Sequence, residues 1–371
     1  MKKLTLFLIY LNCFFVFSQR SKLKSSKYFI DVSTYYGSII KHKPSISHLT
    51  QNHPTGFIFS FNQRSIGKKE WERIYNYPDY GFTFYTQDYH NEKLGKLYAI
   101  NGHYSFYLRH FKERNQVVLK VGTGLSYVTK PYDRYENKKN NIFGSHVNAS
   151  IFFNLYYQRL LLIKNFGIKA GISIIHNSNG SSKSPNSGSN VFSTFVGINY
   201  SLGKKQKRST RRLKSTIPKK ERIKVNLLFL TGKNQSDVIG SDRYPFYHIS
   251  LYADKRISKK SAFQAGFEYF NSKFLKEHIY YKSLSYYPDI PEKLPDYKRV
   301  SVIVGHELFI NKVSAIVQLG YYIYSPFKIE GSIYENIGIK YYLTKHIYSQ
   351  IQLKAHSAKA ESFGFGLGIR I

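Results

Sequence analysis

Residues Val147–Tyr157 (VNASIFFNLYY) alternate between apolar and polar side chains over most of their length. The odd-numbered positions carry the apolar residues Val147, Ala149, Ile151, Phe153, Leu155 and Tyr157, and the even-numbered ones include Asn148, Ser150 and Asn154. Because successive side chains of a strand point to opposite faces, a period of two indicates a β-strand with one apolar face.

The same alternation recurs along the chain in about 16 segments, among them Ile347–Ala355 and Phe363–Ile371. Composition agrees, since 34 Tyr and 28 Phe in 371 residues favour strands. The mean hydropathy of -0.38 excludes a polytopic helical membrane protein, which needs several apolar stretches of roughly 20 residues. The aromatic share of 17% excludes a disordered chain.

A soluble sandwich and an outer-membrane barrel both consist of many antiparallel strands, and three features favour the barrel. The segments are about 9–13 residues long, enough to cross the hydrocarbon layer at a tilt. Tyrosine pairs such as Tyr156-Tyr157 and Tyr341-Tyr342 lie at segment ends, as in an interfacial aromatic girdle. The chain also ends within an apolar alternating segment, although Ile371 stands where barrel proteins usually have Phe. We therefore predict an all-β, antiparallel transmembrane β-barrel of about 12–16 strands.

The N-terminal segment Met1–Ser18 (MKKLTLFLIYLNCFFVFS) has the layout of an export signal. Two lysines precede the apolar stretch Leu4–Phe17, and Ser18 is small enough for signal-peptidase cleavage, which predicts a mature chain that starts at Gln19. The alternative is a buried N-terminal strand or helix. The single cysteine, Cys13, lies inside this segment, so the mature chain is expected to have no disulfide and no thiolate nucleophile. Export predicts the cell outer membrane, reached through transient contact with the barrel assembly machinery.

The formal net charge of +34 is spread over predicted loops rather than one face. Together with export, this excludes a nucleic-acid partner. Anionic lipid headgroups and a general compositional bias both account for the charge. The densely basic, non-periodic stretch 204–224 predicts a linker or loop between a first strand set, 19–203, and the remaining barrel strands, 225–371. A second long loop is predicted over Lys273–Lys298.

The segment 166–178 contains the one group of side chains in the sequence that is suited to catalysis. Its even-numbered positions are apolar up to Ile174 and then continue with His176 and Ser178, so these two side chains share a face and lie within hydrogen-bond reach. In a barrel this face looks at lipid, where such a pair is costly unless it is functional. Asn179 and Asn186 in the following turn-rich loop supply amide donors for an oxyanion hole. The alternative is a surface loop with an incidental histidine.

The quartet His176-Asn177-Ser178-Asn179, followed at matching spacing by Pro185-Asn186, resembles the signature of the lipid A 3-O-deacylase (acyloxyacyl hydrolase) family of outer-membrane barrels. The likeness is tight over a dozen positions and looser over residues 28–203. The later half matches only in general barrel character and in its ending, Lys354–Ile371. The resemblance implies Ser178 as the nucleophile on an acyl ester of lipid A, His176 as the general base, and Asn179 and Asn186 as helpers of the oxyanion. It implies no metal and no cofactor.

The sequence departs from the family at the acidic third member of the triad, which falls on Asn190. An amide oxygen holds the histidine tautomer but supplies no charge to imidazolium. Glu361 and Glu335 are candidate substitutes for the missing carboxylate. We therefore predict an outer-membrane serine esterase that acts on lipid A or a related membrane lipid. The alternative is a non-catalytic barrel: a channel, a structural protein or a decayed hydrolase.

Overall fold

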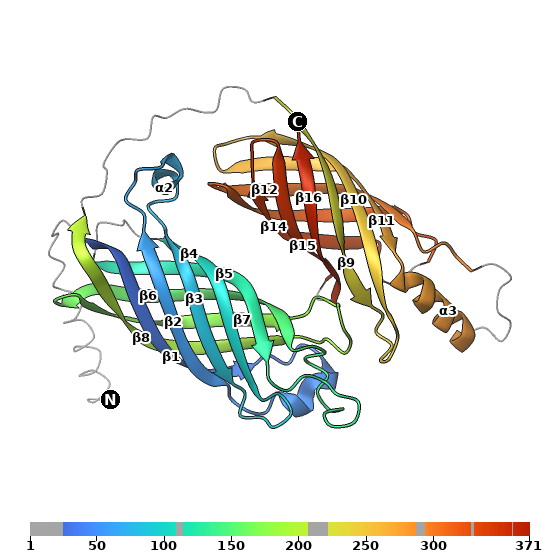
Figure 1. Ribbon diagram of the computed structural model, residues 1–371, viewed down its shortest axis with the longest axis horizontal. Helices are drawn as coiled ribbons and strands as arrows, with labels where there is room; N and C mark the ends of the chain where they lie inside the picture. The colour runs from blue at the N-terminus through green and yellow to red at the C-terminus, as the bar shows by residue number, and fades with distance from the viewer. Residues whose placement is uncertain (1–24, 109–113, 207–221, 287–293, 328–329, 358) are drawn as a thin grey trace, which may run out of the picture.

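The computed structural model describes residues 25–108, 114–206, 222–286, 294–327, 330–357 and 359–371. The predicted antiparallel β-barrel fold is confirmed, but the 16 strands close into two barrels of eight rather than into one (Figure 1). The predicted signal segment 1–18 and most of the basic stretch 204–224 lie outside the described residues.

The first barrel contains β1 (Ser25–Ile39), β2 (Thr55–Arg64), β3 (Asp79–Asp88), β4 (Lys96–Tyr107), β5 (Asn115–Val128), β6 (Val147–Ile163), β7 (Phe166–Ser178) and β8 (Ser189–Gln206). Each strand pairs with the next, and β8 pairs back onto β1, with Val191 opposite Ile39. This last pairing extends to Gln206, at the start of the basic stretch, and closes the barrel there. Alternation fixes the faces of each strand but not the strand at which a sheet closes, and therefore the sequence did not show that each of the two strand sets closes on itself.

The second barrel contains β9 (Lys224–Gln235), β10 (Arg243–Arg256), β11 (Ser261–Ser272), β12 (Arg299–Ile310), β13 (Val313–Tyr324), β14 (Ile333–Tyr342), β15 (Ile347–His356) and β16 (Lys359–Arg370). Here β16 pairs with β9, for example Phe365 opposite Thr231. Two closed barrels leave no free sheet edge between them.

The outer walls are apolar and the interiors polar, as the alternation predicts. In β7, Ile168, Ile172 and Ile174 are 48%, 42% and 45% exposed, whereas Ser173 and Asn177 between and beyond them are buried. This arrangement, with an apolar wall and a polar lumen, is that of a barrel surrounded by lipid.

Bonded side chains fill both interiors. In the first barrel, buried Asp31 accepts hydrogen bonds from Lys120 at 3.3 Å and from Lys169. In the second, Lys340 Nζ lies 2.7 Å from buried Glu307 Oε2, and Glu268 on β11 accepts hydrogen bonds from Ser250 on β10 and, across the interior, from Tyr334 on β14. Buried charges of this kind are stable only when paired, so each interior is a packed polar core.

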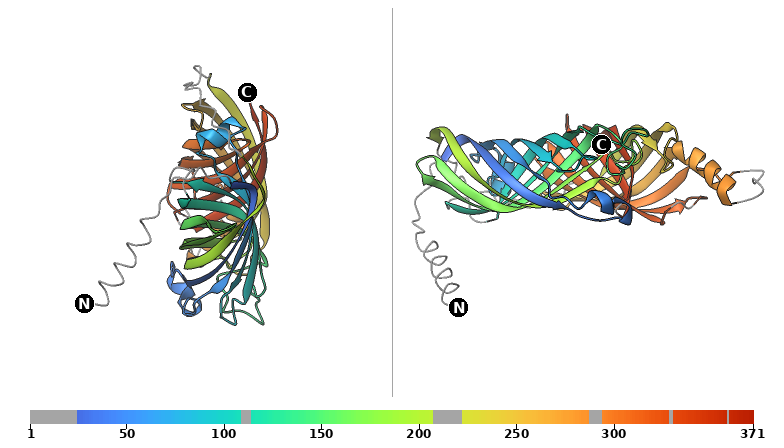
Figure 2. Two further views of the ribbon diagram at one scale, coloured as in Figure 1. Left: turned by 90° about the vertical axis from the view of Figure 1, so that its left-hand side faces the viewer. Right: turned by 90° about the horizontal axis from the view of Figure 1, so that it is seen from below.

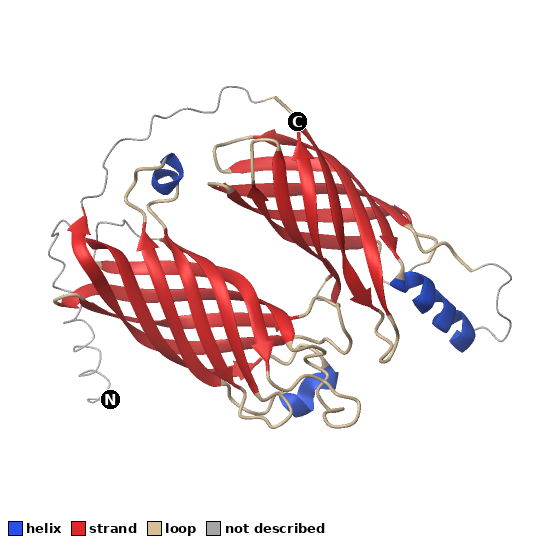
Figure 3. Ribbon diagram, in the orientation of Figure 1, coloured by secondary structure: helices blue, strands red, loops and turns tan. Residues whose placement is uncertain are grey.

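Helical segments occupy three of the connections (Figure 3). The 3-10 helix η1 spans Pro44–Leu49, α2 spans Glu70–Ile74 and α3 spans Phe274–Tyr286. The predicted loop Lys273–Lys298 is therefore partly helical, because α3 buries Phe274, Leu275 and Ile279 against the second barrel. Among the described residues, no helix has the length and apolar character needed to span a bilayer.

The two barrels lie side by side (Figures 1 and 2). We call the end of each barrel where its first strand begins the terminal end, and the opposite end the loop end. At the terminal ends, the Tyr75 hydroxyl donates to the Phe309 carbonyl at 2.6 Å, and Lys259 pairs with Glu70 at 2.5 Å. At the loop ends, a second set of contacts joins the barrels beside the candidate site.

Candidate active site

The candidate site lies where β7 ends at the loop end of the first barrel. His176 and Ser178 follow Ile172 and Ile174 on the outward-facing row, whereas Asn177 is buried on the other face. His176 Nε2 lies 3.0 Å from Ser178 Oγ. The strand geometry thus brings the imidazole and the hydroxyl together, and the loop that follows reduces the exposure of Ser178 to 8%.

Asn190 completes a chain of three hydrogen-bonded side chains. It stands directly opposite His176 in the β7–β8 register, and its Oδ1 lies 2.6 Å from His176 Nδ1. An amide oxygen accepts only, so Nδ1 carries the proton and the Nε2 lone pair faces the Ser178 hydroxyl. This is the tautomer that a general base requires.

His42 is a site residue that the sequence analysis missed. Its Nδ1 lies 3.3 Å from Asn190 Nδ2, and its Nε2 lies 2.9 Å from the Ser187 carbonyl. A proton on Nε2 satisfies that carbonyl and leaves Nδ1 to accept from the Asn190 amide. No local pattern in the sequence points to His42, because its contact with Asn190 depends on the closure of β8 onto β1, which carries the chain after Ile39 past Asn190.

Asn179 and Asn186 are brought together by the loop 179–188. The Asn179 backbone N–H donates to Asn186 Oδ1 at 3.1 Å, and Asn179 Nδ2 donates to Ser145 Oγ at 3.0 Å and to the Lys183 carbonyl at 2.8 Å. Both Asn179 donors are therefore engaged, within the loop and with Ser145 in the connection before β6. Within the described residues, Asn186 Nδ2 makes no hydrogen bond, so it is the donor of this pair that remains available to a ligand.

Gly188 carries the loop closely past the reacting pair. Its φ of +73° is in the left-handed region, and a Cβ there would lie 3.1 Å from Ser178 Cβ and 3.4 Å from His176 Cε1. Both the backbone conformation and the space favour glycine. The sequence analysis did not single out this residue.

The two carboxylates considered as substitutes for the missing acid lie elsewhere. Glu361 is on β16 and pairs with Arg299 and with Lys354 at 3.1 Å, and Glu335 on β14 accepts from the Ser357 N–H at 2.9 Å. Both belong to the second barrel, and in the described part of the chain no carboxylate bonds to His176. Nor does that part contain a group of three His, Cys, Asp or Glu residues arranged to hold a metal ion.

Comparison with solved structures returns outer-membrane barrels. The chain is similar to the outer membrane enzyme PagL with 17% identity and a TM-score of 0.27, over 45% of this chain and 97% of that one. It is similar to Omp33 of Acinetobacter baumannii (8% identity, TM-score 0.19, 94% and 99% covered) and to outer membrane phospholipase A from Escherichia coli (9%, 0.18, 95% and 98%). A search of curated proteins finds no match.

Two family models match, one on each barrel. The model described as lipid A 3-O-deacylase (PagL) matches residues 55–199 and includes the whole of β7. The model described as the C-terminal domain of acyloxyacyl hydrolase matches residues 223–371, from the start of β9 to the end of the chain. Since the two models carry one family over both barrels, the chain belongs to the lipid A 3-O-deacylase (acyloxyacyl hydrolase) family of outer-membrane β-barrel proteins.

Proposed function

We propose that this protein is a serine esterase that removes an ester-linked acyl chain from lipid A or a related lipid of the outer membrane. The observation that carries the proposal is the hydrogen-bonded chain from Ser178 and His176, on the lipid-facing row of β7, to Asn190 on β8. A nucleophile, a base and a group that orients the base are the parts that acyl transfer requires. Family membership supplies lipid A as the substrate class.

The proposed reaction proceeds through an acyl-enzyme. Ser178 Oγ attacks the ester carbonyl while its proton passes to His176 Nε2, which forms a tetrahedral oxyanion. Collapse of this intermediate breaks the bond to the sugar oxygen, and that oxygen takes the proton from His176. Water then repeats the sequence, releasing the fatty acid and restoring Ser178.

Asn186 and Asn179 have different parts in this proposal. Asn186 Nδ2 is the donor offered to the oxyanion, and the Asn179 N–H fixes the other end of the same amide at 3.1 Å. Preorganised donors of this kind stabilise charge that develops in the transition state. Asn179 is thus a positioning residue.

Asn190 would perform the orienting part of an acidic residue without its charge. His42 accepts from Asn190 Nδ2, so that the amide oxygen rather than the nitrogen faces His176. The tautomer is therefore secured, whereas the imidazolium that forms during attack gains no counter-charge. We expect slow but real turnover.

A non-catalytic barrel is the second candidate, and Asn190 is the observation in its favour. Within it, the channel is the least supported form, because a conducting lumen needs open polar space and both interiors here are occupied by bonded side chains such as Asp31–Lys120 and Glu307–Lys340.

The test is mass spectrometry of lipid A from cells that express the wild type, cells that express Ser178→Ala and cells without the gene. We expect loss of one acyl chain with the wild type only, since removal of a nucleophile lowers turnover by at least about 10³-fold. Identical acylation of lipid A in all three strains would exclude the enzymatic hypothesis and favour the non-catalytic barrel.

A further inference from the structure

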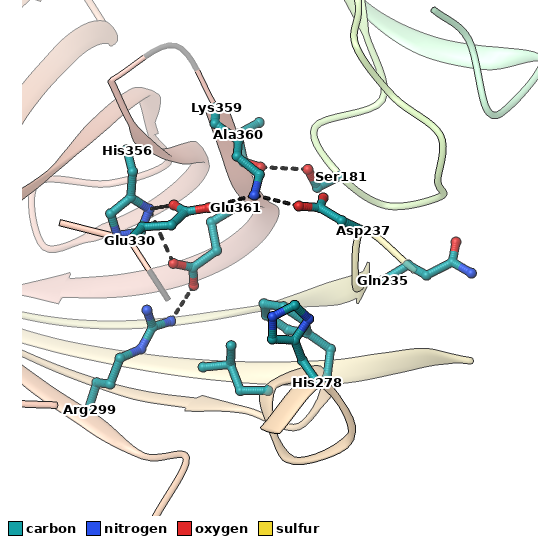
Figure 4. A pocket seen from close by; sticks show the side chains of 12 residues that line it. Ser181, Gln235, Asp237, His278, Arg299, Glu330, His356, Lys359, Ala360 and Glu361 are labelled. Atoms are coloured by element: carbon teal, nitrogen blue, oxygen red, sulfur yellow. Dashed lines mark hydrogen bonds and ion pairs between the residues drawn. The ribbon is translucent and has the colours of Figure 1, made fainter. Parts of the chain in front are cut away.

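The loop 179–188 contributes to the candidate active site and also contacts the second barrel. One part of it forms the site: Asn186 offers the proposed oxyanion donor, Ser187 accepts from His42, and Gly188 packs beside Ser178. Another part lies against the loop end of the second barrel, at the start of β16 and the end of β9 (Figure 4). The following contacts define this second part.

Gln235, at the end of β9, contacts the loop through both its backbone and its side chain. Its N–H donates to the Ser181 carbonyl at 3.1 Å, and its Oε1 accepts from the Ser184 N–H at 2.8 Å. The side chain is 9% exposed, and its Nε2 is held by the Ser241 carbonyl within the second barrel. Gln235 therefore presents a fixed acceptor to the loop.

Three further hydrogen bonds flank this central residue. Ser184 Oγ donates to the Ser236 carbonyl at 2.7 Å, Ser181 Oγ to the Ala360 carbonyl at 2.6 Å, and Arg243 Nε to the Ser182 carbonyl at 2.7 Å. Figure 4 shows Ser181 directed at Ala360, which lies beside the Lys359–Asp237 ion pair. The loop is thus bonded to β9, β10 and β16 of the second barrel.

Close packing adds to the hydrogen bonds at Gly180, two residues after Ser178. A Cβ at this position would lie 2.5 Å from Phe363 Cβ, and the φ of Gly180 is +61°. The loop backbone is therefore in van der Waals contact with the outer wall of β16 immediately after the nucleophile.

We infer that the second barrel is a brace for the active-site loop, with Gln235 as its main positioning residue. Ordering a turn-rich loop costs conformational entropy for every residue that is fixed. The first barrel bonds this loop near its two ends, at Asn179, Ser187 and Gly188. The hydrogen bonds from residues 181–184 to segments outside the loop go to the second barrel. Displacement of a catalytic group by about 1 Å costs up to 10²-fold in rate. The expected change in kcat rests on the proposed esterase function, whereas the expected ordering of the loop does not.

The rival explanation is that these contacts merely hold the two barrels together. The terminal ends provide the control, because the Tyr75 hydroxyl makes a single inter-barrel hydrogen bond there, far from the loop. Tyr75→Phe removes one bond between the barrels, as Gln235→Leu does, but leaves the loop untouched.

The experiment measures kcat and KM for lipid A hydrolysis by the full-length protein in lipid vesicles, together with backbone amide exchange in the loop. We expect Gln235→Leu to lower kcat about tenfold and Ser184→Ala by a smaller factor, with KM within about twofold of wild type and faster exchange at residues 181–184 and at Asn186. Tyr75→Phe should match the wild type in both measurements.

Two outcomes decide against the brace. Unchanged kcat and exchange in Gln235→Leu would overturn it, and so would an equal loss in Tyr75→Phe, which would assign the effect to barrel association. If the wild type hydrolyses no lipid, the proposed function fails, and the exchange comparison alone then decides whether the second barrel orders the loop.

Discussion

His176 and Asn190 face each other across the β7–β8 pair, with Asn190 Oδ1 2.6 Å from His176 Nδ1. The strand register therefore places the orienting group, and the amide occupies the position that a carboxylate takes in other triads. Asn190 therefore has the geometry of the third member of a triad but not its negative charge. The effect of the missing charge can be measured.

Restoring the charge should accelerate hydrolysis. Asn190→Asp keeps the size of the side chain and places a carboxylate oxygen beside His176, so kcat should rise by about tenfold or more. The nearby negative charge also favours protonation of the imidazole, which must be neutral to act as a base. As the pH is lowered, the rate of Asn190→Asp should therefore begin to fall at a higher pH than the rate of the wild type. A pH profile of kcat for the wild type, Asn190→Asp and Asn190→Ala checks this, with Ala expected to be the slowest. A slower Asp variant would show that residue 190 does not orient His176.

His42 should matter more while residue 190 is an amide than when it is a carboxylate. Without His42, the Asn190 amide can turn its nitrogen toward His176 and select the wrong tautomer, so His42→Ala should lower kcat about tenfold. A carboxylate has two equivalent oxygens, and in the Asn190→Asp background the same change should cost less than about twofold. A double-mutant cycle measures this coupling.

The matched control for that cycle is His48→Ala, because His48 bonds to the Lys139 carbonyl at 2.8 Å and has no contact with the triad. Equal losses from His42→Ala in both backgrounds would assign His42 a general structural part instead.

Gly188→Ala should impair catalysis more than folding. The new methyl group would press on Ser178 Cβ from 3.1 Å and bring left-handed strain of about 1–2 kcal/mol. We expect at least a tenfold lower kcat and a small fall in unfolding temperature. Gly203→Ala is the control, because Gly203 has a φ of +74° with nothing within 4 Å of its Cβ position. Equal effects of the two substitutions on kcat would refute the crowding argument.

Local features of the sequence predicted the parts that depend on neighbouring residues. Alternation identified the strands and their lipid-facing rows, and the two-residue spacing of His176 and Ser178 placed both side chains on one face. The position of Asn190 came from the family resemblance, and its contact with His176 depends on the β7–β8 register.

Contacts between distant segments could not be predicted from the sequence. His42 reaches Asn190 only because β8 closes onto β1, across 148 residues. The Gln235–Ser184 bond needs both the second closure and the placement of one barrel beside the other, across 51 residues. Closure depends on shear and strand number, which no short segment encodes.

An even number of strands in each barrel has a consequence for how the polypeptide crosses the bilayer. β1 begins and β8 finishes at one rim, and β9 starts and β16 stops at the matching rim of its own cylinder. The connection from Gln206 to Lys224 thus departs from and arrives at the same side of the membrane. Neither cylinder borrows a strand from the other, so two separately synthesised halves would each possess a complete hydrogen-bonded wall.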